Sequence, residues 1–155
     1  MAEILRVGTD LPAGMTRLAE VAAAEGVRDM QKLVADWQSG AQRFDAGAAA
    51  LFAAIEQGDL AGVGGVKPET GAGESAMRMH RFYVHPSYRR LGIAKRIAHA
   101  AMSHALMHAP LLTCNARASE AAAPFWMALG FAPVDAAGYT HIFRIGTNKS
   151  AWQPC

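Results

Sequence analysis

The sequence is poor in cysteine, in net charge and in long apolar runs, and each shortage excludes a class of protein. Two cysteines, Cys114 and Cys155, are too few for a disulfide framework and are typical of a reducing compartment. No run of about 18 apolar residues occurs, and no basic segment followed by a long apolar one opens the chain. A net charge of only +2 argues against nucleic-acid binding through overall charge. We therefore expect a cytoplasmic protein that binds neither membranes nor nucleic acids.

What the sequence does contain is typical of one globular domain. It has 155 residues, of which 52% are hydrophobic, and no repeats or low-complexity segments. A chain of this length buries about 68–70% of its unfolded surface, which is enough for one core. We expect this domain over residues 1–145 and a C-terminal tail over residues 146–155.

Residues 76–95 carry the clearest signal, because they read as a strand, a basic turn and the start of a helix. The first amides of a helix lack internal partners and its dipole adds partial positive charge, so a helix start preceded by Arg89 and Arg90 attracts phosphate. Gly92 can take a positive φ and lets the backbone approach a ligand closely. The stretch predicts a phosphate site made mainly of backbone N–H groups.

The strand in this stretch, residues 76–84, should alternate its side chains between the two faces of a sheet. Strict alternation places Arg78, His80, Phe82 and Val84 on one face and Met77, Met79, Arg81 and Tyr83 on the other. Before this strand, residues 48–66 predict a hairpin, in which Gly62, Gly64 and Gly65 indicate a bulge or a close backbone approach. After it, residues 111–115 predict a buried strand and residues 121–129 a helix.

The spacing Arg89-x-x-Gly92-x-Ala94 resembles the acyl-CoA pyrophosphate loop of the GNAT superfamily of N-acetyltransferases, whose pattern is Arg/Gln-x-x-Gly-x-Gly/Ala. Residues 84–90 also resemble that family's strand end and loop entry, and residues 125–131 resemble its later helix-to-strand motif. The resemblance covers roughly residues 51–134. It implies a single α/β (α+β) domain with a central mixed, mostly antiparallel sheet of about six to seven strands flanked by about four helices.

The resemblance further implies acetyl-CoA as co-substrate. Its pyrophosphate would lie on the loop from Arg89 to Lys95, and its pantetheine arm would lie between diverging central strands. Asn115 is a candidate for the same arm and is equally typical of a strand-end turn. The implied cofactor-binding residues are Phe82, Tyr83, Val84, Arg89, Arg90, Leu91, Gly92, Ile93, Ala94, Lys95, Asn115 and Trp126.

The catalytic residues follow from the same resemblance. In the family, the base is often an acidic or histidine side chain two to six residues before the position of Val84, where this chain has Arg78 and His80. Arginine cannot accept a proton, so His80 is the candidate catalytic base and Arg78 a candidate partner for an acceptor carboxylate. A half-buried structural role for His80 is the alternative.

The acid is less clear, because the tyrosine that protonates the leaving thiolate in many relatives is replaced by Trp126. An indole N–H is not a useful acid. Ser119, Tyr83, Tyr139 and His141 are substitutes that the sequence does not rank.

A metal site is not expected. His104 and His108 stand four residues apart, but zinc sites need at least three protein ligands and the sequence offers no obvious third one nearby.

Three functions are compatible with these residues. The first is transfer of an acetyl group from acetyl-CoA to a primary amine, by direct attack in a ternary complex. The second is a non-catalytic acyl-CoA-binding or sensing module, which the loss of the tyrosine favours. The third is a phosphate-binding interaction domain without CoA chemistry. For the first, the acceptor is a small-molecule or peptide amine, and exposed strand edges would allow a homodimer.

Overall fold

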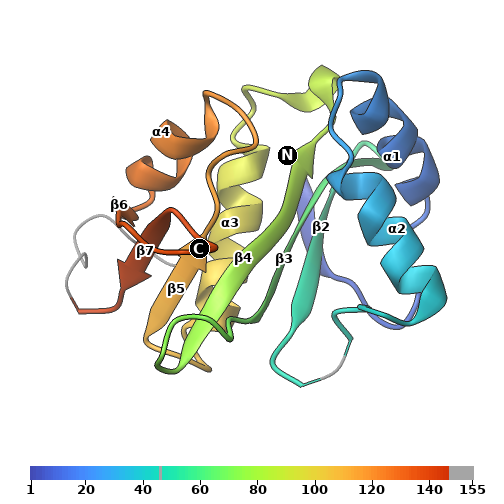
Figure 1. Ribbon diagram of the computed structural model, residues 1–155. Coiled ribbons are helices and arrows are strands. Elements are labelled where there is room, and N and C mark those ends of the chain that lie inside the picture. Colours follow the sequence, from blue (N-terminus) through green and yellow to red (C-terminus); the bar gives the residue numbers. More distant parts are fainter. Residues whose placement is uncertain (46, 147–155) are drawn as a thin grey trace.

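The computed structural model describes residues 1–45 and 47–146, in which seven strands form one sheet and four α-helices cover it (Figure 1). The strands are β1 (Glu3–Arg6), β2 (Ala50–Glu56), β3 (Asp59–Pro68), β4 (Ala76–Val84), β5 (Leu111–Cys114), β6 (Ala132–Pro133) and β7 (His141–Arg144). The helices are α1 (Met15–Ala24), α2 (Asp29–Ser39), α3 (Ile93–Ala105) and α4 (Ala122–Ala128), and a short 3-10 turn, η1 (Pro86–Tyr88), precedes α3. The expected fold is confirmed. The predicted tail lies outside the described residues beyond Gly146, and so does Cys155.

The sheet has the order β1-β2-β3-β4-β5-β7-β6. Among the described strands, only β4 and β5 run parallel, and their pairing covers three residue pairs, from Ala76↔Leu111 to Arg78↔Thr113. Beyond Arg78, β4 continues to Val84 without β5 beside it. The two strands therefore diverge toward their carboxyl ends.

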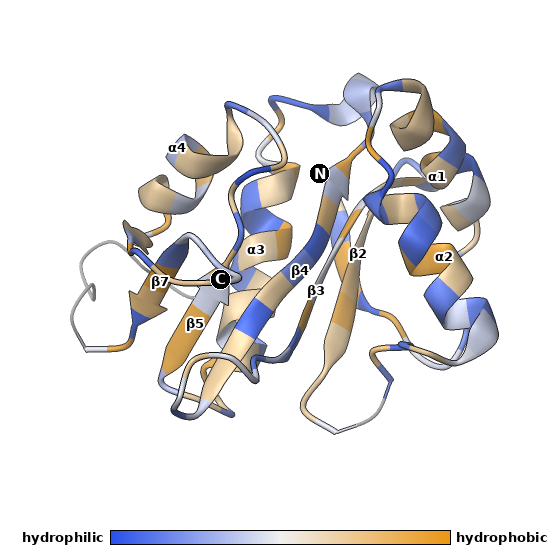
Figure 2. Cartoon of the chain, viewed as in Figure 1, coloured by the Kyte–Doolittle hydropathy of each residue, from blue (hydrophilic) through white to orange (hydrophobic). Residues whose placement is uncertain are grey.

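The helices form one layer on each face of the sheet. On one face, α3 buries Ala98, Ala101 and Met102 against a core that also includes Trp126 and Leu129 of α4 and its C-cap. On the other face, α1 and α2 bury Leu18, Leu33 and Trp37. Figure 2 shows hydrophilic and hydrophobic bands alternating along these helices, as expected for helices with one buried side. In the described ranges, none of the helices is both long and apolar enough to cross a membrane.

A bulge in β4 overturns the predicted strict alternation. Arg81 has a φ of 62°, and Gly64 faces two residues of β4 because the register moves from Val63↔Tyr83 to Gly65↔His80. The inserted residue turns the following side chains over. Phe82 and Val84 consequently pack with Ile93 and Ile97 on the α3 face, which Met77 and Met79 also share. His80, Arg81 and Tyr83 face α1 and α2, where His80 contacts Phe44, Arg81 pairs with α2 and Tyr83 joins the core.

Gly64 makes room for this arrangement. A Cβ at this position would lie 2.4 Å from the Phe82 ring and 2.8 Å from Cγ2 of Ile97. The close approach predicted from the glycines is therefore confirmed, and the Phe82 ring lies over the strand where a side chain would otherwise stand.

Candidate active site

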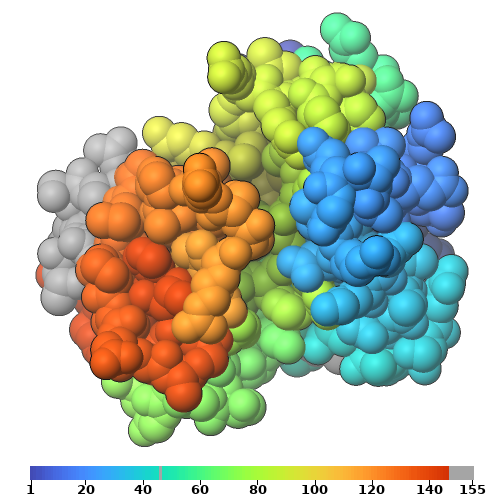
Figure 3. Space-filling view, turned by 45° about the horizontal axis from the view of Figure 1, so that its top comes forward, coloured from blue at the N-terminus to red at the C-terminus, as the bar shows by residue number. Residues whose placement is uncertain are grey.

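A cleft of about 620 Å³ opens where β4 and β5 diverge. Its walls come from the carboxyl-terminal half of β4, the loop after β5, and α4, with contributions from the starts of α2 and α3. Figure 3 shows the hollow between the orange segment that includes α4 and the blue segment that includes α1 and α2. Ligand sites in α/β proteins commonly lie at the carboxyl ends of strands, in the place that this cleft occupies.

The cleft brings together most of the residues expected from the sequence. Those that line it are His80, Phe82, Tyr83, Val84, Arg89, Ala94, Asn115 and Trp126. The other expected residues, Arg90, Leu91, Gly92, Ile93 and Lys95, belong to the loop and first turn of α3 beside it and do not line it. Of these, Ile93 is 3% exposed and packs into the core, so only its backbone can serve a ligand.

The start of α3 has the geometry of an anion site. Arg90 and Gly92 have positive φ values of 65° and 76°, so the loop turns sharply before the helix. The N-cap is Gly92, no side chain caps the helix and no acidic residue stands in its first turn. The first amides are therefore left for an outside partner, and exposed Arg90 and Lys95 add positive charge.

Arg89 has a structural partner that the sequence did not reveal. Its guanidinium donates to both carboxylate oxygens of Glu25, the C-cap residue of α1, and its Nε donates to the Val84 carbonyl at 3.1 Å. The hydroxyl of Tyr83 also donates to Glu25. The hydrogen bonds from Arg89 and Tyr83 hold the pKa of Glu25 below its usual value. Burial and Glu25 together raise the pKa of Tyr83 to about 12, so this hydroxyl stays protonated.

His80 is a half-buried neutral imidazole that lines the cleft. Burial, together with the nearby charges of Lys67, Arg81 and Arg78, lowers its pKa to about 3. Its ring lies 6.1 Å from that of Phe44, centroid to centroid. A base whose conjugate acid is this strong holds a proton poorly, although its ring nitrogen can still accept a hydrogen bond.

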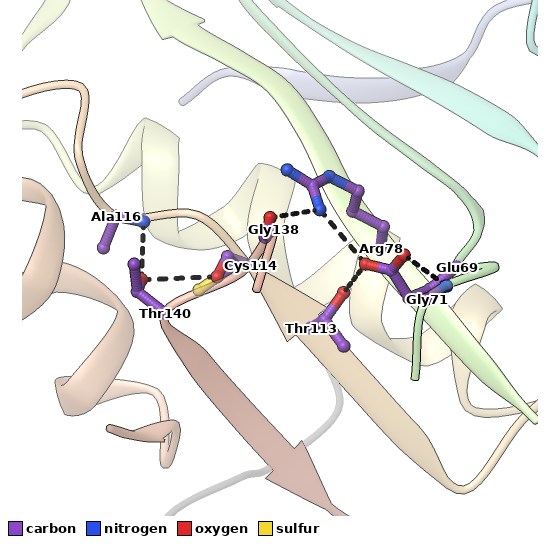
Figure 4. Close-up of polar contacts among 8 residues, drawn as sticks. All are labelled: Glu69, Gly71, Arg78, Thr113, Cys114, Ala116, Gly138 and Thr140. Atoms are coloured by element: carbon purple, nitrogen blue, oxygen red, sulfur yellow. Dashed lines mark hydrogen bonds and ion pairs between the residues drawn. The ribbon is translucent and has the colours of Figure 1, made fainter. Parts of the chain in front are cut away.

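Arg78 stands in a polar network that joins three segments (Figure 4). Its Nη1 donates to Oε1 of Glu69 at 3.1 Å and to the Gly138 carbonyl at 2.8 Å. Burial disfavours the charge on Glu69, but hydrogen bonds from the Gly71 N–H, the Thr113 hydroxyl and Arg78 outweigh it and hold its pKa below the usual value. The network fixes the Arg78 guanidinium at the edge of the cleft.

Arg81 links the bulge of β4 to α2. Its side chain is 14% exposed and pairs with Asp29 at 3.3 Å and Asp36 at 3.4 Å. Asp29 and Arg117 also line the cleft, although neither was predicted to, and so does Ser119, which the sequence offered as a candidate acid. No local sequence pattern predicts that Asp29 lines the cleft, because its position depends on how α2 packs over β4.

Trp126 lines the cleft and is packed in a cluster of rings. Its ring lies 5.0 Å from Phe82, 5.0 Å from Phe125 and 5.2 Å from Phe131. Among the substitutes considered for the missing acid, Ser119 and Tyr83 line the cleft that the described residues form, whereas Tyr139 and His141 do not. His141 instead shares a hydrogen bond with the Thr140 hydroxyl.

The surroundings of the Cys114 thiol and the His104 imidazole indicate structural roles for both. Burial raises the pKa of the Cys114 thiol to about 12, so it remains an unreactive thiol. Nε2 of His104 bonds the Ala48 carbonyl at 2.8 Å, and residues 1–45 and 47–146 contain no group of three potential metal ligands.

Solved structures share this fold. A protein from Exiguobacterium sp. 255-15 assigned as an acetyltransferase is 25% identical, with a TM-score of 0.81 over 97% of this chain and 95% of that one. A GNAT family acetyltransferase from Brucella melitensis in complex with acetyl-CoA is 14% identical, with a TM-score of 0.63 over 96% and 90%. The PaiA N-acetyltransferase from Thermoplasma acidophilum in complex with coenzyme A is 16% identical, with a TM-score of 0.64 over 93% and 99%. No curated protein matches the sequence.

The fold is thus that of an acyltransferase. The profile of the acetyltransferase (GNAT) domain matches residues 18–145, and the chain belongs to this family.

Proposed function

We propose that the protein transfers the acetyl group of acetyl-CoA to a primary amine by direct attack within a ternary complex. The observation that carries the proposal is one continuous cleft, which runs from the start of α3 along β4 to His80. The uncapped amides of α3 would bind the pyrophosphate, with Arg90 and Lys95 adding charge. The backbone of residues 82–84, together with Asn115, would pair with the amides of the pantetheine arm.

Acetyl-CoA would supply an activated acyl carbon in its thioester. The amine nitrogen would form a bond to this carbon as the bond to sulfur breaks, and one proton would leave the nitrogen while another reaches the sulfur. Cys114 offers no competing route through a covalent intermediate, since its buried thiol is not ionised at neutral pH. This supports direct attack.

His80 would orient the attacking amine by accepting a hydrogen bond from it. Its pKa of about 3 makes it too weak a base to deprotonate an ammonium group efficiently. The acceptor would therefore react as the free amine, after losing its proton to water.

Trp126 would pack against the CoA arm without protonating the sulfur, so Ser119 or water would supply that proton. The acceptor would be a small-molecule or peptide amine. We further propose a cytoplasmic protein in which β1 and β6, the two edge strands of the described sheet, are free to form a homodimer.

Thermal unfolding with acetyl-CoA, free CoA and ATP tests the cofactor. A ligand at a hundred times its Kd stabilises the fold by about 2.7 kcal/mol, or several degrees for a domain of this size. We expect both CoA species to raise the Tm and ATP to raise it little. Release of free thiol with a panel of amines then tests transfer.

Each result of these two measurements has a separate meaning. No stabilisation by either CoA species would contradict the proposal. Stabilisation without thiol release from any amine would favour an acyl-CoA-binding or sensing role, which the tryptophan at position 126 makes the second candidate.

A further inference from the structure

We infer that the acceptor amine also carries a carboxylate, which the free edge of the Arg78 guanidinium binds. This inference rests on the proposed function of the cleft, and it names the class of acceptor as amino-acid-like.

The described residues hold the Arg78 guanidinium through only one of its nitrogens. Both of its hydrogen bonds, to Glu69 and to the Gly138 carbonyl, use Nη1. Within the part of the chain that the structure describes, Nη2 and Nε have no partner, and Figure 4 shows them turned away from Glu69. Two neighbouring donors on one edge of a guanidinium match the two oxygens of a carboxylate. The arginine is therefore held in place and still has an open edge.

The Arg78 side chain lies near the position proposed for the acceptor amine. Arg78 lines the cleft two residues before His80, and both side chains lie on the sheet face opposite α3, since Met77 and Met79 pack toward α3. An amine bound at His80 would thus have a cationic group within the reach of one small molecule. The side chain of Arg78 is 21% exposed, so a bound anion would be partly shielded from water.

Charges are unevenly distributed around Arg78 and Arg81. Arg81 faces two carboxylates, Asp29 and Asp36, which leaves an excess of one negative charge. Lys67, the cross-strand neighbour of Arg78, forms no ion pair within the described ranges and lies beside the cleft lining, near the carboxylates of Glu69 and Asp36. Beside Arg78 the excess charge is therefore positive, which suits an acceptor that bears a carboxylate.

Burial and the charges of Arg78 and Arg81 lower the pKa of Lys67, as expected for a cation without a paired anion. A carboxylate bound at Arg78 would relieve this repulsion. A second cation there would increase it, so the site disfavours polyamines.

Matched acceptors test the inference. Amino acids are compared with their own carboxamides, and with a polyamine, by thiol release from acetyl-CoA. We expect kcat/KM for the acid to exceed that for its amide by about 10- to 100-fold, the range for a charge-assisted pair. Arg78→Gln should remove most of this ratio and Arg78→Lys only part of it. Arg144→Gln is the control, because Arg144 also pairs with a glutamate but does not line the cleft.

The outcomes separate the inference from the proposed function. Equal kcat/KM for acids and amides, a preference for the polyamine, or an acid preference that survives Arg78→Gln would overturn the inference while leaving acetyl transfer in place. Stabilisation by acetyl-CoA without transfer to any acceptor would overturn the inference as well. No stabilisation by acetyl-CoA would instead overturn the proposed function. If Arg78→Gln does not fold, the ratio measured with the unaltered protein still decides.

Discussion

Arg89 and Glu25 lie 64 residues apart in the sequence, and two guanidinium nitrogens of the first donate to the two carboxylate oxygens of the second at 3.0 and 2.6 Å. The pair ties the loop before α3 to the end of α1. Because the Arg89 guanidinium already has these partners, we expect it to position the loop, while backbone amides bind the phosphate.

Glu25→Gln should lower the stability of the protein at neutral pH. The pair is partly exposed, with side-chain exposures of 45% and 33%, so we expect a loss of about 1 kcal/mol, or about 2 to 4 °C in Tm. Arg89 and Tyr83 lower the pKa of Glu25 in the folded protein. The ionised Glu25 carboxylate therefore stabilises the fold above pH 4.5, its usual pKa, and this stabilisation is lost as the pH falls below 4.5. Thermal unfolding at pH 7 and pH 3 should show a smaller Tm difference between the unaltered protein and Glu25→Gln at pH 3. Glu20→Gln, at an exposed helical pair with Arg17, is the control, and an equal loss there would argue against a special role for Glu25.

Gly92→Asp should weaken acetyl-CoA binding at least tenfold, because it sets a carboxylate where we place the pyrophosphate. The matched control is Gly73→Asp. Gly73 has a φ of 74°, close to the 76° of Gly92, and a Cβ would meet no atom within 4 Å at either position. Both variants should lose similar stability from backbone strain, about 1 kcal/mol. Calorimetric titration measures the affinity, and an unchanged Kd for Gly92→Asp would remove the phosphate site from this loop.

His80→Asn should make the protein less sensitive to acid. The folded pKa of His80 is about 3 and its ordinary value is 6.5, so between these pH values the unfolded chain binds a proton that the folded chain does not. The native state therefore loses stability as the pH falls from 6.5 toward 3. Urea unfolding at pH 7 and pH 5 measures this loss, which should be smaller in His80→Asn and unchanged in His108→Asn, at an exposed position. Identical losses in all three proteins would mean that His80 takes up its proton at the same pH in the folded and the unfolded chain.

Trp126→Tyr should turn over faster than Trp126→Phe. Both changes shrink a side chain that is 6% exposed, so both should cost about 1 to 3 kcal/mol of stability. Only the tyrosine adds a hydroxyl able to protonate the leaving sulfur, and positioned acids contribute about 10²- to 10⁴-fold where proton transfer limits the rate. We expect at least a tenfold higher kcat for the tyrosine variant in the thiol-release assay. Equal kcat values would indicate that protonation of the sulfur does not limit the reaction.

Much of the fold could be predicted from sequence, because the signals were local. The helix that starts after Gly92 and the hairpin within residues 48–66 each depend on residues close together in the chain. The bulge at Arg81 was missed since no glycine marks it on its own strand, and the space for it comes from Gly64 on the neighbouring strand. Strict alternation then assigned Phe82 and Val84 to the wrong face.

The phosphate loop of the candidate site could be predicted from the sequence, but the ion pairs of its charged side chains could not. The loop follows from the spacing of Arg89, Gly92 and Ala94. The ion pair of Arg81 with Asp29 joins residues 52 apart, and that of Arg78 with Glu69 depends on the β3–β4 turn and on Thr113 of β5. Such contacts are set by tertiary packing, which no local pattern records.

The short pairing of β4 with β5 has a mechanical consequence. Three residue pairs make up all the backbone strand pairing between a half-sheet of β1 to β4 and a half-sheet of β5 to β7, among the described strands. A ligand that binds in the gap beyond this pairing and forms hydrogen bonds to both strands would restrict the motion of the two half-sheets. Without the ligand, we expect the two half-sheets to move relative to each other. The β4 amides after Arg78 that face the gap should then show the fastest hydrogen exchange in this strand. The bound co-substrate would thus connect the two half-sheets as an additional strand would, and its release would remove this connection.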